Sequence, residues 1–142
     1  AKESTLDVDL KFEVLPEFQA EFLRCLRLLS REMQIPVEQV SPEEFIPLPP
    51  GSRDRCQFLG RFGEVDVFHF DFYSIALSKL HRGNEKDFAD IMAMLQVGLI
   101  EFDVFARYFA EILPKLESYR LESDPDAFQR KFGFLKNLLG IE

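Results

Sequence analysis

The stretch "VDVFHFDFYSIALSKLHRG", Val65–Gly83, changes its hydrophobic period partway along its length. Before Asp71, side chains alternate in character with the period of a β-strand. After Asp71, apolar residues recur every three or four positions, which is the period of an amphipathic helix. Asp71 is a suitable N-cap for this helix, and Gly83 is a suitable stop. The stretch therefore separates a strand-rich front from a helical rear, and it predicts an α+β fold.

Helical patterns fill the chain behind this stretch. One runs from Asn84 to Gly98, one from about Glu101 to Leu113, and one from a cap at Ser123 or Asp124 to Gly140. We expect Pro114 to interrupt or kink the second of these helices, because proline has no backbone N–H to donate. Pro125 suits the first turn of the last helix, where that N–H is not needed. The rear of the chain is therefore predicted to be a helical lobe.

The front of the chain mixes short strands with one helix. The expected elements are a strand within Ser4–Glu13, a helix opened by Pro16 that ends before Pro36, and a short strand over Val37–Val40. The runs "RCQFLGRF" and "EVDVFHF" flank Gly63 and are typical of a β-hairpin. These patterns predict one domain over residues 1–142, with a small mixed β-sheet core in residues 1–70 and a helical lobe in residues 71–142.

Length and charge limit the class of protein. The 142 residues suffice for one domain of ordinary size. The formal net charge of −8 disfavours a protein that coats nucleic acid by charge, which requires a basic surface. No apolar run is long enough to span a bilayer and no leader pattern is present, so a cytoplasmic location is expected. Cys25 and Cys56 lack metal-ligand spacing, and we expect both to be free thiols.

Two carboxylates stand two residues apart in "TLDVDLKFE", at Asp7 and Asp9. In a strand both side chains point to the same face. One interpretation is a solvated strand whose polar face happens to be acidic. The other is a magnesium site, because Mg²⁺ takes hard oxygen ligands from one or two carboxylates and completes its shell with water and substrate phosphates. The spacing alone fits both interpretations.

Asp66 adds a third strand carboxylate, in the run "VDVFH". We expect its strand to be a neighbour of the Asp7–Asp9 strand, so that Asp7, Asp9 and Asp66 can converge on metal ions. Such a group of carboxylates is what a two-metal phosphoryl-transfer site needs. An outward-facing strand residue with no ligand accounts for Asp66 equally well.

Four charged residues form a second cluster around the predicted turn at Gly83. Lys79 and Arg82 lie three residues apart at the end of one helix, and Asp87 and Asp90 lie three apart near the start of the next. Helix dipoles alone favour cations at a C-terminus and carboxylates at an N-terminus, by about 0.3 to 1 kcal/mol each. A tight turn would nevertheless bring the two pairs together, which predicts a knot of opposite charges between two apolar helices.

The combination of both clusters resembles a known family. "TLDVDLKFE" followed by "VDVFHFDFYSIALSKLHRGNEKDFADIMAMLQVGLI" is similar to nucleotidyltransferase-like proteins of bacteria and archaea that are related to the abortive-infection toxins of type IV toxin-antitoxin systems. These proteins belong to the polymerase-β-like nucleotidyltransferase superfamily. The resemblance implies a small mixed sheet that carries Asp7 and Asp9 as metal ligands. It also implies that Lys79 and Asp87 complete the site, with Asp90 next in line.

The sequence departs from the superfamily pattern in one respect. The superfamily has a Gly-Gly or Gly-Ser turn about ten residues before the Asp-x-Asp, whose backbone N–H groups hold the triphosphate. Asp7 is too close to Ala1 for such a turn, and the "GS" at Gly51 and Ser52 lies on the wrong side of the motif. Asp66 matches the third carboxylate of the superfamily only loosely. The expectation is therefore a chain that lacks its natural first strand and helix, or a reduced domain that binds without catalysing.

Two functional hypotheses follow. The first is a Mg²⁺-dependent nucleotidyltransferase that moves a nucleoside monophosphate from an NTP to a hydroxyl of a protein, RNA or small molecule. Asp7 and Asp9 would hold the metal, Lys79 and Arg82 would bind phosphates, and Asp87 would orient the lysine or act as a base. The second is a non-catalytic module, degenerate or antitoxin-like, in which these charges are structural. Its partners would be a second copy of the chain or an antitoxin.

Overall fold

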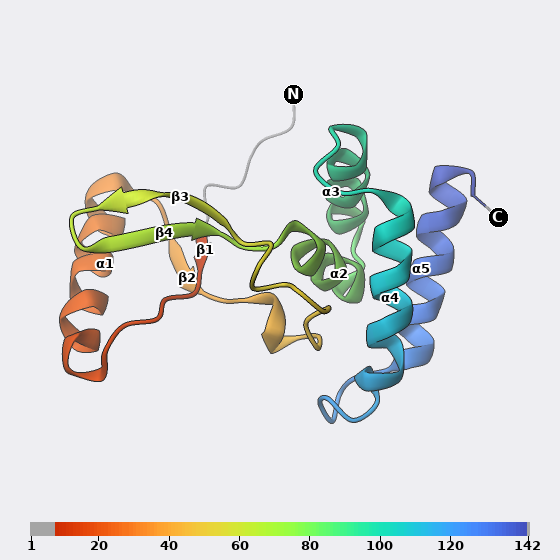
Figure 1. Ribbon diagram of the computed structural model, residues 1–142, viewed down its shortest axis with the longest axis horizontal. Coiled ribbons are helices and arrows are strands. Elements are labelled where there is room, and N and C mark those ends of the chain that lie inside the picture. The colour runs from red at the N-terminus through yellow and green to blue at the C-terminus, as the bar shows by residue number, and fades with distance from the viewer. Residues whose placement is uncertain (1–7, 142) are drawn as a thin grey trace. The chain divides into compact units, whose positions relative to one another are not determined.

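The computed structural model describes residues 8–141 and divides the chain into two compact units, Ala1–Glu44 and Phe45–Glu142. Figure 1 shows that the first unit combines one helix with short strands, and that the second combines a β-hairpin with a group of helices. The predicted α+β fold is confirmed. The β-structure consists of two separate two-stranded sheets, one parallel and one antiparallel, within the described residues.

The first unit is a strand–helix–strand arrangement. Its elements are β1 (Val8–Leu10), a 3-10 helix (Pro16–Phe18), α1 (Gln19–Met33), β2 (Val37–Gln39) and a second 3-10 helix (Pro42–Glu44). β1 and β2 pair in parallel, which requires a crossover, and α1 provides it. The prolines flank α1 as predicted. Gln34 ends the helix in the left-handed conformation with φ 56°.

A cavity of about 290 Å³ lies between α1 and the β1–β2 pair. Apolar side chains of the strands and the helix, among them Leu10, Leu26 and Val37, contribute to its lining, together with the arginines Arg27 and Arg31. No side chain of α1 is fully buried. The first unit is therefore a thin layer with little core of its own.

The second unit opens with the predicted hairpin. β3 (Gln57–Phe62) and β4 (Val65–His69) run antiparallel, and Gly63 turns between them with φ 66°. That positive φ favours glycine. The register shifts between Phe58 and Gly60, where an extra residue forms a bulge.

Four helices complete the second unit. They are α2 (Phe72–Arg82), α3 (Glu85–Gln96), α4 (Phe102–Leu116) and α5 (Pro125–Leu139). The predicted caps at Asp71, Asn84 and Asp124 are confirmed, because each side chain accepts hydrogen bonds from backbone N–H groups of the first turn. The predicted end of α4 at Leu113 was wrong. Helix α4 continues past Pro114 to Leu116, whose side chain is completely buried in the core.

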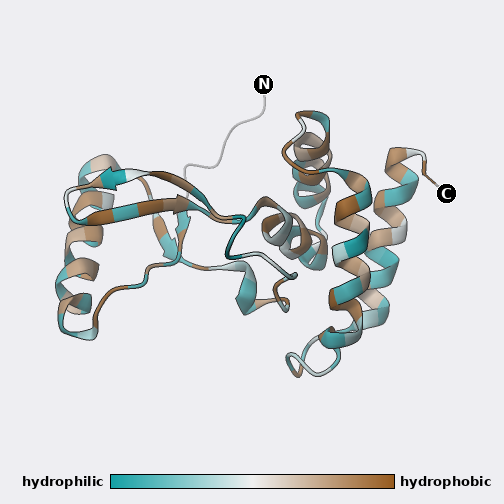
Figure 2. Ribbon diagram, viewed as in Figure 1, coloured by the Kyte–Doolittle hydropathy of each residue, from teal (hydrophilic) through white to brown (hydrophobic). Residues whose placement is uncertain are grey.

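The hydrophobic core lies among these helices. Figure 2 shows brown hydrophobic segments recurring along each helix of the second unit. The fully buried side chains of this core are Ile46, Ala76, Leu77, Leu80, Ile91, Ile100, Phe105, Ile112, Leu116, Phe128 and Leu135. Aromatic rings join α4 to α5, since Phe109 stacks on Phe132 with ring centroids 4.1 Å apart and approaches Phe128 at 4.7 Å. The core fixes the helices that carry the turn at Gly83. Within residues 8–141, no helix has the length and apolar character that a membrane crossing requires.

Candidate functional site

The turn between α2 and α3 is held by a complete capping box. Gly83 has φ 63°, and its N–H donates to the carbonyl of Lys79 at 2.8 Å. The side chain of Asn84 accepts from the N–H of Asp87 at 2.9 Å, and the Asp87 carboxylate accepts from the N–H of Asn84 at 3.2 Å. This arrangement fixes the first turn of α3. It thereby places the carboxylates of α3 beside the cations of α2.

Arg82 and Asp87 form the tighter of two ion pairs across this turn. Arg82 Nη2 lies 2.6 Å from Asp87 Oδ1, and Arg82 Nε lies 2.9 Å from Oδ2. The side chain of Asp87 is 1% exposed, whereas that of Arg82 is 59% exposed. A buried carboxylate requires such partners, because burial without compensation strongly disfavours its charge. Arg82 therefore supplies hydrogen bonds and a positive charge to the buried Asp87 carboxylate, while much of the Arg82 side chain stays exposed to solvent.

Lys79 pairs with Asp90, not with Asp87. Lys79 Nζ lies 3.0 Å from Asp90 Oδ2, and both side chains are partly buried. The predicted knot of opposite charges is thus present. Its connections differ from one alternative of the enzyme hypothesis, in which Asp87 would orient the lysine: in the structure Lys79 pairs with Asp90, and Arg82 pairs with Asp87. The i to i+3 spacing predicted the shared faces but not which cation meets which carboxylate.

Lys131 is a further member of the cluster that sequence reasoning missed. It comes from α5, about fifty residues downstream, and its Nζ donates to the carbonyl of His81 at 2.6 Å. The stem of Lys131 lies against the turn, since a Cβ added to Gly83 would fall 2.6 Å from Lys131 Cδ. No local pattern around Lys131 distinguishes it from the other cations of α5. The packing of α5 against α2 brings it here.

The same contact affects His81, which is partly buried at the end of α2. Burial, followed by the positive charge of Lys131, lowers the pKa of His81 below its ordinary value of 6.5. The His81 ring also lies against Phe128, with centroids 5.9 Å apart. His81 therefore stays neutral down to a lower pH than a free histidine does.

Asp9 occupies the middle of β1, and its side chain is exposed. The parallel register places Glu38 of β2 directly opposite Asp9. Glu38 was not singled out from the sequence, although "VEQV" is a strand pattern with one outward carboxylate. Asp7 lies outside the described residues. The acidic position next to Asp9 in the sheet is therefore Glu38.

Asp66 lies in a different sheet, on β4. Its carboxylate binds Arg61 of β3, with Arg61 Nε 2.7 Å from Asp66 Oδ1 and Nη2 3.2 Å from Oδ2. The partner of β1 is β2, so the expected neighbouring strand is not the one that the structure pairs with it. The metal role of Asp66 stays a prediction.

Another buried carboxylate, Asp71, is tied to the base of the hairpin. Arg55 precedes β3 and Asp71 follows β4, and two 2.9 Å hydrogen bonds, Nε to Oδ1 and Nη2 to Oδ2, join them. The Asp71 carboxylate also accepts from the N–H groups of Tyr73 and Ser74. Arg55 lies over the ring of Tyr108 of α4, 4.4 Å from its centroid. The sequence predicted Asp71 as a cap but gave no sign of Arg55 as its partner.

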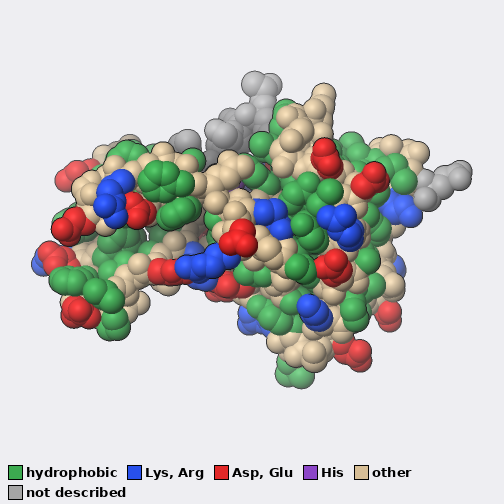
Figure 3. Space-filling view, in the orientation of Figure 1, with side chains coloured by type: hydrophobic (Ala, Val, Ile, Leu, Met, Phe, Trp, Pro, Cys, Tyr) green, Lys and Arg blue, Asp and Glu red, His purple; other side chains and the backbone are tan. Residues whose placement is uncertain are grey.

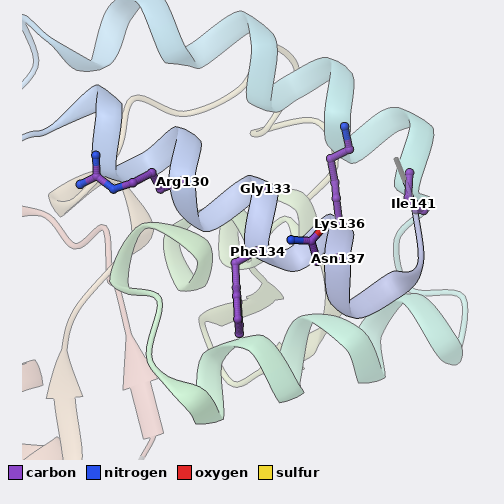
Figure 4. Close-up of a pocket in the computed structure, with 6 residues that line it drawn as sticks. All are labelled: Arg130, Gly133, Phe134, Lys136, Asn137 and Ile141. Atoms are coloured by element: carbon purple, nitrogen blue, oxygen red, sulfur yellow. The ribbon is translucent and has the colours of Figure 1, made fainter.

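A hollow of about 480 Å³ lies on the outer side of α5, where Figure 4 shows Arg130, Phe134 and Asn137 among the residues that line it. The described residues contain no group of three or more His, Cys, Asp or Glu side chains close enough to hold a metal ion. On the face of the second unit seen in Figure 3, acidic and basic side chains are interspersed with apolar ones.

Comparison with known proteins decides the family. A protein-family model described as "Nucleotidyltransferase of unknown function (DUF6036)" matches residues 1–132. The chain belongs to this family. No curated protein and no solved structure gives a significant match.

Membership in a nucleotidyltransferase family agrees with the resemblance drawn from the two charged clusters. The matched residues include both clusters, and they extend through α5 as far as Phe132. Lys131 is therefore part of the nucleotidyltransferase domain. The family description names no acceptor and no metal.

Proposed function

We propose that this protein is a Mg²⁺-dependent nucleotidyltransferase that transfers a nucleoside monophosphate from an NTP to a hydroxyl acceptor. The observation that carries the proposal is the match of a nucleotidyltransferase family model over residues 1–132, which include the exposed Asp9 of β1 and the ion-paired Lys79 and Arg82. In such a reaction the acceptor hydroxyl attacks the α-phosphate and pyrophosphate leaves. The proton of the acceptor hydroxyl passes to water, so the products are the nucleotidylated acceptor, pyrophosphate and a proton.

The chemistry of the donors at β1 suits magnesium. Asp9 offers a hard oxygen ligand on an exposed strand, and Mg²⁺ is commonly bound by one or two carboxylates together with substrate phosphates. Asp9 and Glu38 stand opposite each other in the register, and like charges in that relation destabilise a sheet unless a cation compensates them. Asp7 and Asp9 would hold the ion, with Glu38 beside them. A bound magnesium ion would supply charge neutralisation to the triphosphate.

The α2–α3 turn would contact phosphates. Lys79 is partly exposed and held by Asp90, and Arg82 is more exposed and held by Asp87. Each carboxylate fixes its cation in one position, so that less side-chain freedom is lost when an anion binds. Asp87 is committed to Arg82 and to the capping box. We therefore assign Asp87 an orienting role rather than that of the base.

Calorimetry of ATP, GTP, CTP and UTP with Mg²⁺ tests the proposal, with the wild-type protein and Asp9→Ala compared. Glu64→Ala is the matched control, because it removes an exposed carboxylate in the turn of the β3–β4 hairpin. We expect Mg²⁺-dependent binding that Asp9→Ala abolishes and Glu64→Ala retains. Transfer of α-labelled nucleotide to an acceptor fraction would then establish catalysis. Equal binding by wild type and Asp9→Ala would refute the metal assignment.

A second candidate function is a non-catalytic interaction module of the toxin-antitoxin kind. One observation favours it: Lys79 and Arg82 are both engaged in ion pairs inside the fold, as purely structural charges would be. This candidate expects no nucleotide binding by the wild-type protein. It also expects loss of fold stability, and nothing else, when those pairs are broken.

A further inference from the structure

The ammonium group of Lys131 has donors left over at the α2–α3 turn. A lysine ammonium carries three N–H donors, and the bond to the His81 carbonyl uses one of them. The side chain of Lys131 is partly exposed. It therefore stands at the surface of the turn with donors that an anion can accept.

Lys131 also changes the charge balance of the cluster. Lys79 and Arg82 each form an ion pair at this turn, with Asp90 and Asp87 respectively. Lys131 adds a third cation, from α5, beside the end of α2, in a chain whose formal net charge is −8. A local cationic site in an acidic protein attracts anions that the rest of the surface repels.

Gly83 leaves room for the stem of this lysine. A Cβ at Gly83 would lie 2.6 Å from Lys131 Cδ and 2.8 Å from Cε, which is closer than real Cβ contacts. Glycine at this position therefore gives both the positive φ and the room for the lysine stem.

We propose that Lys131 is a phosphate-binding residue of the same site as Lys79 and Arg82, so that a polyphosphate chain is held from α2 and α5 together. That the polyphosphate belongs to a nucleotide rests on the proposed function. The phosphate contact itself requires only the geometry of the turn. Lys131 would then contribute to substrate binding through charge-assisted hydrogen bonds, which are stronger than those between neutral groups.

Inorganic tripolyphosphate, with EDTA present to exclude metal, is the probe. Binding is compared in wild type, Lys131→Met, Lys131→Arg and Lys136→Met. Lys136→Met is the matched control, because it removes the same charge from the same helix but from a side chain that lies over Phe132. We expect Lys131→Met to weaken binding by about tenfold, as loss of one charge-assisted hydrogen bond does. Lys131→Arg should restore most of the affinity, and Lys136→Met should keep it.

A spectroscopic readout separates binding from a structural role. The NMR titration of the His81 ring is recorded with and without tripolyphosphate. An anion on Lys131 should raise the pKa of His81 from its lowered value, because it offsets the positive charge that contributes to the lowering. A change in His81 that is absent in Lys131→Met supports the proposal. An unchanged His81 titration at saturating tripolyphosphate overturns it.

The other results of the binding experiments also decide whether Lys131 binds phosphate. No binding of tripolyphosphate by wild type, or equal weakening by Lys131→Met and Lys136→Met, overturns the inference. Failure of the proposed function is seen separately, since metal-free binding does not involve Asp9. Tripolyphosphate binding that depends on Lys131, without any Asp9-dependent binding of NTP, leaves the phosphate site standing and removes the transferase. NTP binding that depends on Asp9 but is unchanged in Lys131→Met supports the metal assignment and overturns the role of Lys131.

Discussion

Arg55 and Asp71 close the open end of the hairpin with a bidentate ion pair, in which both N–O distances are 2.9 Å. Arg55 stands two residues before β3, and Asp71 stands two residues after β4. Because Asp71 is also the N-cap of α2, one buried carboxylate joins the hairpin to the helical lobe. Burial lowers the pKa of Arg55, but its hydrogen bond to Asp71 and the charge of that carboxylate raise it by more, so the net shift is upward.

Removal of Arg55 is expected to destabilise the second unit strongly. Asp71 is 1% exposed, and Arg55→Met would remove the cation beside it, which costs about 3 kcal/mol of unfolding free energy. Urea unfolding of wild type and variant measures the difference. Arg61→Met is the control, because Arg61 pairs with Asp66 on the exposed part of the same hairpin. We expect little change in the unfolding free energy of Arg61→Met. Equal losses from both variants would show that the Arg55–Asp71 pair stabilises the fold no more than the exposed Arg61–Asp66 pair does.

Gly83 is expected to tolerate alanine less well than Gly140 does. The two residues have similar positive φ values, 63° and 71°, and each follows a helix. Alanine at either position pays the left-handed penalty of about 1 to 2 kcal/mol. Only at Gly83 would the new Cβ also collide with Lys131. Thermal unfolding should therefore show a larger loss for Gly83→Ala than for Gly140→Ala.

The double variant Gly83→Ala with Lys131→Ala isolates the collision. Shortening the lysine should recover most of the loss that exceeds the Gly140→Ala value, and the remainder should come from the Leu80 carbonyl oxygen, 3.1 Å from the added Cβ. If Gly83→Ala and Gly140→Ala lose the same stability, the lysine stem moves aside without cost, and the turn is not shaped around it.

His81 is expected to make the fold less stable in mild acid. Its pKa is lowered in the folded protein, first by burial and then by Lys131, so the unfolded chain binds the proton more readily. The unfolding free energy should therefore fall as the pH drops below 6.5, the ordinary value, and should level off below the folded pKa. Urea midpoints between about pH 8 and about pH 5 follow this range. His81→Gln should remove that part of the dependence, and Lys131→Met should reduce it. A wild-type midpoint with the same pH slope as His81→Gln would contradict the prediction.

The sequence predicted the helical lobe well because its signals are local. The caps at Asp71, Asn84 and Asp124 and the glycine stops act within one turn of the chain, so they can be read without knowledge of the fold. The error at Pro114 arose because burial of Leu116 in the core extends α4 past a residue that local rules place at its end.

The candidate site was only partly predictable because its contacts are between distant residues. The period of α2 and α3 predicted that Lys79, Arg82, Asp87 and Asp90 would meet, but the pairing depends on side-chain directions that the spacing does not fix. Lys131 reaches the turn through the packing of α5. Glu38 meets Asp9 through strand register, which depends on the crossover rather than on either strand.

Asp87 is expected to matter more to folding than Asp90. Asp87→Asn would leave the buried partner of Arg82 without its charge and would weaken the capping box, whereas Asp90 is 18% exposed and lies outside the capping box. We expect a loss of about 2 kcal/mol for Asp87→Asn and about 1 kcal/mol or less for Asp90→Asn, from chemical denaturation. Nucleotide binding, measured at a temperature where both variants are folded, should instead respond to Asp90→Asn, because Asp90 holds Lys79. A larger loss of stability in Asp90→Asn than in Asp87→Asn would contradict the prediction and would show that the Lys79–Asp90 pair stabilises the fold more.

Magnesium is expected to stabilise the first unit through the acidic pair on its sheet. Asp9 and Glu38 are opposed in the β1–β2 register, and the repulsion between them costs about 0.2 to 1 kcal/mol when no cation is bound. Glu38→Gln should therefore raise the unfolding temperature in EDTA. Added Mg²⁺ should raise it in wild type by mass action and should do so less in Glu38→Gln and not in Asp9→Asn. Glu43→Gln is the control, because Glu43 belongs to the same unit but binds Lys11. A Mg²⁺ response that is the same in all four proteins would mean that the ion acts elsewhere, and the metal assignment on β1 would fall with it.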